Sequence, residues 1–476
     1  MTNNIVKISM ENASTTNNGI FQGWGTSLCW WAHRVGYSPV LTRKSAKLFF
    51  GDEGLDLNIM RYNIGGGDNP THKHVKRTDS MIPGWLIYNK DGDSYTYDYN
   101  ADSNQLNVLK ACYNESGEDA FVEVFSNSPP YFMCKSGCSS GGKNPNENNL
   151  RNDCYDAFAR YLAEVTEYIN NTLNIRVSSI SPMNEPDTDF WHYMSEKQEG
   201  CHFDPGDSQN EIIIKTSREI HARGLRHVDV VASDETSTDK ALNSYKLYSQ
   251  EAKNVIDRIS THTYNTKKIN SLGKLMRAEN RNLWMSETDW SSVSSKKAGE
   301  MGAGLWFAQK IISDINALSP SAWVMWLTID RHISKDGYMG NKDTGAPDTK
   351  GGYWGIAFAD HDKQDVILTK KYYCFGQFSR FIRPGDTIIH TSKTTLGAIS
   401  KDKNTLTLVA VNKNSRDKEL TIDVSDFKQH GIIKAVRTSG TMADGESWSE
   451  LKSISFDSPI ITLPLKGHSV TTFIIK

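Results

Sequence analysis

Two glutamates that follow apolar, strand-like runs are the residues of this chain best suited to catalysis. Glu185 lies in the run Ser178-Ser-Ile-Ser-Pro-Met-Asn-Glu-Pro-Asp187, where two prolines flank a short polar turn. Proline fixes its own backbone angle and restricts the residue before it, so Glu185 sits on a stiff segment. Glu287 ends a second apolar run, Leu283-Trp-Met-Ser-Glu-Thr-Asp289. Two such carboxylates can cleave a glycosidic bond, because one can protonate the leaving oxygen while the other attacks the sugar carbon.

Either glutamate alone could be a solvated residue of a strand-ending turn, so the surrounding elements matter. Strand-like and helix-like segments alternate along the chain. The expected strands cover residues 21–27, 57–63, 121–125, 177–181, 228–233, 259–263, 283–286 and 322–327, and the clearest helices cover residues 39–50, 104–114, 153–171, 210–223 and 297–317. This alternation predicts an α/β fold, a (β/α)8 TIM barrel, whose strands end at one catalytic face. Glu185 then closes strand four and Glu287 closes strand seven.

The pattern changes after Pro384. Short strand-like runs cover residues 405–411, 420–424, 432–437, 460–465 and 470–475, with turn residues between them and no helical pattern. This spacing predicts a β-sandwich, and the alternating run at residues 5–10 could pair with it. We therefore expect a catalytic barrel over residues 20–383 and an attached β-sandwich side domain built from residues 1–19 and 384–476.

Composition limits the classes of partner. The chain has 476 residues with a formal net charge of -2, which gives no support to nucleic acid or an anionic membrane as a partner. No apolar run approaches the ~18 residues of a membrane span. The 12 Trp and 19 Tyr often stand near Gly, Asn and Asp, as in loops that line a cleft, and aromatic rings suit the apolar faces of sugars. The expected partner is a polysaccharide or oligosaccharide, bound by a monomer.

No metal and no cofactor are expected. Cys134 and Cys138 have a spacing found in some metal sites, but a second such pair is missing. His72 and His74 are interpreted as residues of a solvated loop. Residues 1–18 lack the charged-then-apolar pattern of a secretory signal, so the protein is expected to be secreted or extracellular with its signal removed, and a cytoplasmic location stays open. Seven cysteines cannot all pair, and they do not decide the compartment.

Several motifs together resemble those of the retaining glycoside hydrolases of clan A, specifically family 30 and its branch of endo-β-1,6-galactanases. They are Gly23-Trp-Gly-Thr-Ser-Leu-Cys-Trp-Trp31, Arg61-Tyr-Asn-Ile-Gly-Gly66, Ser126-Asn-Ser-Pro-Pro130, Gln198-Glu-Gly-Cys-His-Phe203 and Tyr372-Tyr-Cys-Phe-Gly-Gln-Phe-Ser-Arg-Phe-Ile-Arg-Pro-Gly385. The resemblance runs from about residue 21 to the end of the chain. It implies that Glu185 is the acid/base and Glu287 the nucleophile. It also implies that Asn184 binds the sugar 2-hydroxyl and that Arg61 lies near the nucleophile.

The resemblance also directs the search for substrate contacts. Asn127 stands where other branches of the family often carry Trp, which argues against a glucosylceramidase-like or xylanase-like pocket. The expected polar contacts are Asn63, Asn127 and Asp234, and the expected aromatic contacts are Trp30, Trp31 and Trp326. Tyr264 is expected to hydrogen-bond Glu287.

Each of these assignments has a structural alternative. One of the two adjacent tryptophans, Trp30 or Trp31, could belong to the core. Arg61 could be part of a barrel ion pair, and His262 could be a packed interior residue. Trp191 could form a further subsite or hold its own loop in place.

The leading hypothesis is a retaining enzyme that cleaves β-1,6-linked galactan of the arabinogalactan type. The alternatives are a β-1,6-glucanase or another family 30 exo-β-glycosidase and, in a different class, a glycan-binding protein on the same fold. The presence of both glutamates argues against the binding protein. A separate glycan-binding role of the side domain would depend on its few aromatic residues, such as Trp448.

Overall fold

The computed structural model describes residues 5–89, 94–289, 297–343 and 353–476. Eight parallel strands form a closed barrel with the order β10-β11-β2-β3-β6-β7-β8-β9. They are β2 (Gly23–Ser27), β3 (Ile59–Asn63), β6 (Phe121–Phe125), β7 (Val177–Ser181), β8 (Asp229–Glu235), β9 (Arg258–His262), β10 (Asn282–Thr288) and β11 (Ala322–Leu327). The predicted barrel is therefore confirmed, and each predicted strand overlaps one of these eight.

The glycine-rich first strand has a packing reason. Gly25 of β2 pairs with Ile59 of β3. A Cβ added at Gly25 would lie 2.5 Å from the Cβ of Ile59, far inside van der Waals contact. Glycine at this position therefore allows the two strands to approach closely enough to close the barrel.

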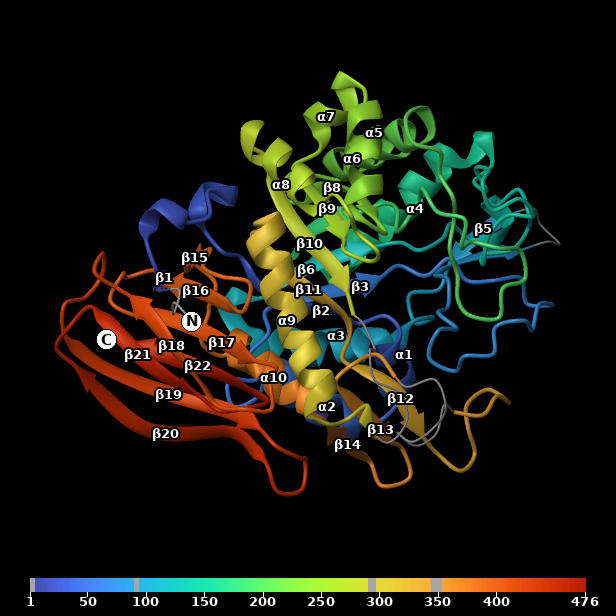
Figure 1. The fold of residues 1–476 in the computed structure, drawn as a ribbon. Coiled ribbons are helices and arrows are strands. Elements are labelled where there is room, and N and C mark those ends of the chain that lie inside the picture. The colour runs from blue at the N-terminus through green and yellow to red at the C-terminus, as the bar shows by residue number, and fades with distance from the viewer. Residues whose placement is uncertain (1–4, 90–93, 290–296, 344–352) are drawn as a thin grey trace.

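Helices surround the barrel (Figure 1). They are α1 (Trp31–Val35), α2 (Pro39–Phe50), α3 (Ser103–Ser116), α4 (Tyr155–Glu167), α5 (Asp207–Ala222), α6 (Thr238–Leu247), α7 (Gln250–Val255), α8 (Ile269–Ala278), α9 (Met301–Leu318) and α10 (Lys370–Ser379). Helix α2 has the bounds that its sequence predicts, since Ser38 caps it and Pro39 occupies its first turn. Helix α9 begins four residues later than its apolar pattern predicts. Two small sheets extend the barrel loops: β4 (Leu86–Asn89) with β5 (Ser94–Tyr97), and β12 (Ile329–Ile333) with β13 (Ala357–Asp360) and β14 (Asp365–Leu368).

Two further sheets form the side domain. One has six strands in the order β15-β16-β17-β22-β19-β20, and the other has three strands in the order β1-β18-β21. Their bounds are β1 (Val6–Lys7), β15 (Thr387–Ile389), β16 (Thr395–Ile399), β17 (Leu406–Asn412), β18 (Lys418–Asp423), β19 (Gly431–Ser439), β20 (Glu446–Phe456), β21 (Ile460–Leu465) and β22 (Ser469–Ile475). Val6 pairs with Ile422, so the start of the described chain is part of this sandwich. Strands β15, β16 and β20 were not predicted.

Helices α9 and α10 lie between the barrel and the six-stranded sheet (Figure 1). The contact is polar as well as apolar, because the ammonium group of Lys370 on α10 donates to the carbonyl oxygens of Ser439 at 3.0 Å and Glu446 at 2.7 Å. The indole N–H of Trp448 donates to the carbonyl oxygen of Tyr373 on the same helix at 2.7 Å. Trp448 therefore holds the side domain against the barrel rather than presenting a free aromatic surface for glycans.

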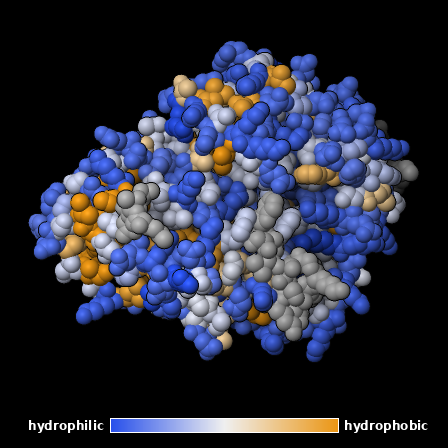
Figure 2. Space-filling model, viewed as in Figure 1, coloured by the Kyte–Doolittle hydropathy of each residue, from blue (hydrophilic) through white to orange (hydrophobic). Residues whose placement is uncertain are grey.

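The face in Figure 2 is mostly hydrophilic, with apolar residues gathered over the side domain, where Ile432 and Ile460 are about half exposed. Within the described residues, no helix has the length and apolar character to cross a membrane. All seven cysteines are buried and free.

Candidate active site

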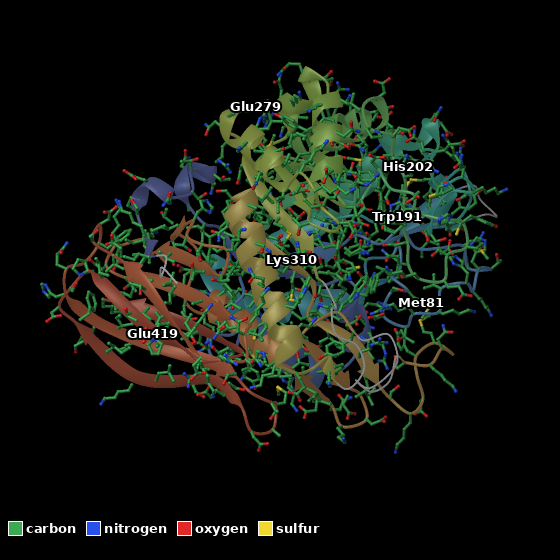
Figure 3. All side chains as sticks on the ribbon, viewed as in Figure 1. Met81, Trp191, His202, Glu279, Lys310 and Glu419 are labelled. Atoms are coloured by element: carbon green, nitrogen blue, oxygen red, sulfur yellow. The ribbon has the colours of Figure 1, made fainter. Side chains whose placement is uncertain are left out.

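A cavity of about 500 Å³ opens where the carboxyl ends of the barrel strands meet, and its size is typical of a small-molecule site. Glu185 and Glu287 both line it. The other lining residues are Trp30, Asn184, Phe190, Trp191, Ser195, Lys197, Gln198, Thr236, Tyr264, Asn265, Asp289, Trp326 and Trp354. Trp191 comes from the long loop between β7 and α5 and is labelled in Figure 3. The two glutamates predicted at the ends of strands four and seven are thus brought to one cavity.

Glu287 lies at the end of β10 and is held by three partners. Arg61 donates to its Oε2 at 3.2 Å, and the hydroxyl of Tyr264 donates to its Oε1 at 3.2 Å. The Nδ1 of His262 lies 3.7 Å from the same Oε1. Burial raises the pKa of Glu287, and the positive charges of His262 and Arg61 act against that rise.

Glu185 follows β7 in a left-handed backbone conformation, with φ of +47°. Such a conformation is unfavourable for a residue with a side chain, and two hydrogen bonds secure it here. The backbone N–H of Glu185 donates to the carbonyl oxygen of Asp234 at 2.8 Å, and the indole N–H of Trp191 donates to the carbonyl oxygen of Glu185 at 3.0 Å. Trp191 therefore both lines the cavity and fixes the turn that carries Glu185.

His262, at the end of β9, connects the two glutamates. Its Nδ1 lies 3.0 Å from the Oε1 of Glu185, and its Nε2 lies 3.3 Å from the Oδ1 of Asp234. Burial alone would lower the pKa of His262, but the charges of Glu287 and Asp234 raise it to about 10. The imidazole is therefore positively charged at neutral pH. His262 is a buried residue of the barrel interior, which was one of the two expectations, and it also contacts both Glu185 and Glu287.

Arg61 lies beneath the cavity and is fully buried. Besides Glu287, it donates to Glu123 at 3.0 Å and to Asp234 at 2.5 Å. Burial would raise the pKa of Asp234, but Arg61 and His262 hold that pKa well below its usual range. Arg61 thus orients the nucleophile candidate and also belongs to a barrel ion-pair network.

The charges around the two glutamates nearly balance. Arg61, Arg258 and His262 supply three cations among the described residues of this network. Four carboxylates face these cations, from Glu123, Glu185, Asp234 and Glu287.

Aromatic side chains form the cavity wall. Trp30 and Trp326 meet edge to face with ring centroids 5.0 Å apart. Among the described residues, the indole N–H groups of Trp30 and Trp326 and the Oδ1 of Asn184 have no hydrogen-bond partner. Buried polar groups are normally paired, so these three atoms leave hydrogen-bonding capacity unused beside the cavity.

Four residues that were expected to contact substrate do not line the cavity. Trp31 packs in the core, where its indole N–H donates to the carbonyl oxygen of Ser27 at 2.9 Å. Asn63 is fully buried, and its amide donates to Glu199 at 2.8 Å. Asn127 lies beside Asn63, with 3.4 Å between Nδ2 and Oδ1. Asp234 is fully buried against Arg61, as described above. Asn63, Asn127 and Asp234 support the residues of the wall instead of forming it.

Sequence reasoning missed several lining residues. Lys197 and Gln198 come from the loop after β7, where Gln198 begins the motif that runs to Phe203. The ammonium group of Lys197 lies 5.1 Å from the ring centre of Trp354. Burial lowers the pKa of Lys197, and Glu185 acts in the opposite direction. Phe190, Ser195, Thr236, Asn265, Asp289 and Trp354 were also missed. All stand in loops or at strand ends, where no periodic pattern shows which way a side chain points.

The comparisons with known proteins agree with this geometry. The family model described as O-Glycosyl hydrolase family 30 matches residues 5–339. An endo-beta-1,6-galactanase of Hypocrea rufa is 29% identical over 484 residues, covering 96% of this chain and 92% of that protein. An exo-beta-1,6-galactobiohydrolase of Bifidobacterium longum is 24% identical, covering 86% of this chain and 34% of that protein. The crystal structure of a conserved exported protein from Bacteroides fragilis superposes with a TM-score of 0.76 at 19% identity, covering 99% of this chain and 100% of that one. The family match spans well over half of the chain, and the chain therefore belongs to O-glycosyl hydrolase family 30.

Proposed function

We propose that this protein is a retaining glycoside hydrolase that cleaves β-1,6-linked galactan. The observation that carries the proposal is the pair of cavity-lining glutamates that share contact with one charged histidine. The near full-length similarity to an endo-beta-1,6-galactanase supports the choice of substrate. A glycan-binding protein on the same fold would not need two carboxylates connected in this way.

The spacing of the carboxylates favours retention of configuration. A carboxylate oxygen of Glu185 and one of Glu287 lie within 4.8 Å of each other. Retaining glycosidases keep their carboxyl groups about 5–5.5 Å apart, whereas inverting enzymes need roughly 6.5–9.5 Å to admit a water molecule. The short separation supports a covalent mechanism.

In the first step, Glu287 attacks the anomeric carbon while Glu185 gives its proton to the leaving oxygen. Arg61 and Tyr264 hold the carboxylate of Glu287 in place for this attack. Glu287 is assigned as the nucleophile because Arg61 and Tyr264 both contact its carboxylate, and Glu185 is then the acid/base. Once Glu287 forms the glycosyl ester its negative charge is gone, so Glu185 can ionise and take a proton from the water that hydrolyses the ester.

The cavity suits a galactosyl unit. The axial 4-hydroxyl of galactose leaves one face of the ring comparatively apolar, and Trp30 and Trp326 offer aromatic surface to such a face. Asn184 has an unpaired amide oxygen beside Glu185, which suits a contact with the sugar 2-hydroxyl. Lys197 and Gln198 supply further polar groups for hydroxyl recognition.

The organisation of the whole molecule fits an enzyme that acts on a polymer. We assign residues 20–383 to the catalytic barrel and residues 1–19 with 384–476 to the side domain, which braces the barrel through α10. The protein works as a monomer outside the cell, where a polysaccharide is accessible. It binds no nucleic acid or membrane.

Product analysis tests the proposal. The protein is incubated side by side with β-1,6-galactan, β-1,6-glucan and glucuronoxylan, and the products are separated by anion-exchange chromatography. We expect galactose-containing oligosaccharides from the first substrate and little product from the other two. Comparable catalytic efficiency on β-1,6-glucan would favour the glucanase alternative. Release of monosaccharide or disaccharide alone, with no longer products, would favour an exo-acting enzyme.

A further inference from the structure

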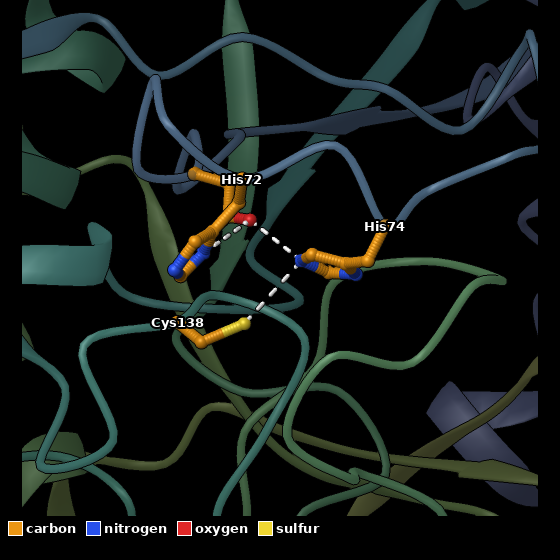
Figure 4. Close-up of side chains that lie close together, drawn as sticks. His72, His74 and Cys138 are labelled. Carbon is orange, nitrogen blue, oxygen red and sulfur yellow. Dashed lines mark hydrogen bonds and ion pairs between the residues drawn. The ribbon is translucent and has the colours of Figure 1, made fainter.

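We propose that Asp68, His72, His74 and Cys138 bind one zinc ion that clamps the loops at the rim of the cavity. Each residue offers one donor atom, and the four atoms lie within 4.8 Å of one another. Asp68 and the two histidines come from the loop after β3, and Cys138 comes from the loop after β6. Figure 4 shows both imidazole rings and the thiol close together, with a dashed line from the thiol to His74.

The distances between the donor atoms approach those of a tetrahedral site. The Oδ2 of Asp68 lies 3.1 Å from the Nδ1 of His72 and 2.7 Å from the Nε2 of His74. The Sγ of Cys138 lies 3.4 Å from the same Nε2. Zinc bonds of about 2.0–2.3 Å separate neighbouring ligands by roughly 3.3–3.8 Å. To bind zinc, the contact between Asp68 and His74 must open by about half an ångström or slightly more, and the contact between Asp68 and His72 by about 0.2 Å.

The hydrogen bond on the other side of His74 orients its ring for metal binding. The Nδ1 of His74 lies 2.6 Å from the carbonyl oxygen of Ser195, so it carries a proton and donates it. In the neutral ring, Nε2 then presents a lone pair directly to the carboxylate of Asp68. Two lone pairs at 2.7 Å repel each other, so a cation must lie between them, either a proton or a metal ion. Metal-bound histidines commonly donate their second nitrogen to a carbonyl oxygen in this way.

The carboxylate is fixed as well, since the backbone N–H of Ser139 donates to the Oδ1 of Asp68 at 3.0 Å and leaves Oδ2 facing the histidines. The chemistry of the donor set selects zinc. One thiolate, two imidazoles and one carboxylate match the sulfur, nitrogen and oxygen ligands of Zn²⁺, whereas Mg²⁺ and Ca²⁺ prefer oxygen ligands alone.

The arrangement suits a structural site. Four protein ligands leave no open position for a substrate, and Cys138 is fully buried while His72 and Asp68 are only slightly exposed. Through His74 the ion would also support Ser195, whose loop continues to Lys197 and Gln198 in the cavity wall. Zinc would thus connect the loops after β3, β6 and β7 on one side of the active site.

Metal analysis of untagged protein is the first test. The protein is stripped with a chelator, saturated with Zn²⁺, freed of excess metal and measured by inductively coupled plasma mass spectrometry. We expect about one zinc per chain and a higher Tm than that of the stripped protein. Cys138→Ser and His72→Gln should lose stoichiometric zinc and the zinc-dependent gain in Tm.

Cys134→Ser is the matched control, because Cys134 is buried in the same loop with its thiol directed at the carbonyl oxygens of Pro129 and Pro130. Cys134→Ser should keep both the stoichiometric zinc and the zinc-dependent gain in Tm.

Cobalt substitution identifies the ligands without relying on activity. In the wild type and in Cys134→Ser, bound Co²⁺ should give a thiolate-to-cobalt charge-transfer band, and Cys138→Ser should not. His72→Gln alters a partly exposed side chain, so it keeps the test decisive if Cys138→Ser fails to fold. Wild-type protein that stays free of zinc after saturation, with an unchanged Tm, would overturn the proposal. Stoichiometric zinc retained by both ligand variants would also overturn it, because the ion would then be bound elsewhere.

Discussion

Replacing His262 with glutamine should make the stability of the protein less dependent on pH. His262 is fully buried between Glu185, Glu287 and Asp234, and its pKa is raised to about 10. In the unfolded chain its pKa returns to about 6.5. Between these two values the folded protein holds a proton that the unfolded chain has released, so raising the pH favours unfolding.

The magnitude follows from the size of the shift. Each pKa unit corresponds to about 1.4 kcal/mol, so the free energy of unfolding contributed by His262 falls by that amount per pH unit above about 6.5. At pH 8.5 the loss amounts to about 3 kcal/mol. It approaches 5 kcal/mol as the pH nears the folded pKa, an order-of-magnitude upper bound for a fully buried group. The contribution is fully present below pH 6.5.

Urea unfolding at pH 6, 7.5 and 9 measures this effect. The quantity compared at each pH is the difference in the free energy of unfolding between the wild type and His262→Gln. Buried thiols such as Cys29 and Cys112 also titrate in the unfolded state, but both proteins contain them, so their contribution cancels in this difference. We expect the advantage of the wild type to shrink by several kcal/mol from pH 6 to pH 9. A difference that stays constant over this range would refute the assignment of a charged His262.

Three further predictions concern the cavity. Glu287→Gln should fold like the wild type and lose at least about a thousandfold in kcat, because an amide cannot form the glycosyl ester. A smaller loss of kcat in a folded sample would show that Glu287 is not the nucleophile. Glu185→Ala should lose far more activity on natural glycans than on aryl glycosides with good leaving groups, and azide should restore turnover with formation of a β-glycosyl azide; equal losses without rescue would exclude Glu185 as acid/base. Trp326→Phe should lower kcat/KM by roughly tenfold or more, because Trp326 lines the cavity. Trp31→Phe should leave kcat/KM unchanged and destabilise the fold by about 1–3 kcal/mol through its lost hydrogen bond. A larger loss of kcat/KM in Trp31→Phe than in Trp326→Phe would contradict this placement of the two side chains.

The barrel and its two glutamates could be predicted because they depend on local signals. Buried parallel strands commonly contain apolar runs, such as residues 283–285 before Glu287, and the turn after a barrel strand lies at the catalytic face, as it does for Glu185 and Glu287. Strand β15 was missed because it has only three residues, and β16 because Gly397 interrupts its apolar residues. Strand β20 was missed because its partly exposed residues have no continuous apolar pattern.

The direction of individual side chains was harder to predict. Trp30 and Trp31 are neighbours in sequence, yet only Trp30 faces the cavity, because Trp31 begins α1 and turns into the core. Asn63 and Asn127 stand at strand ends as expected, but they point beneath the wall toward Glu199 and each other. No local pattern linked His72 and His74 to Cys138, since Cys138 stands 64 residues after His74 and only the fold brings them together.

The stereochemistry of the first product tests the central claim most directly. Wild-type protein is mixed with β-1,6-linked galacto-oligosaccharide, and the anomeric protons of the new reducing end are followed by NMR before mutarotation. Two displacements at one carbon, by Glu287 and then by water, predict that the β anomer appears first. An α anomer at the earliest time points would mean a single displacement by water and would contradict the covalent role of Glu287.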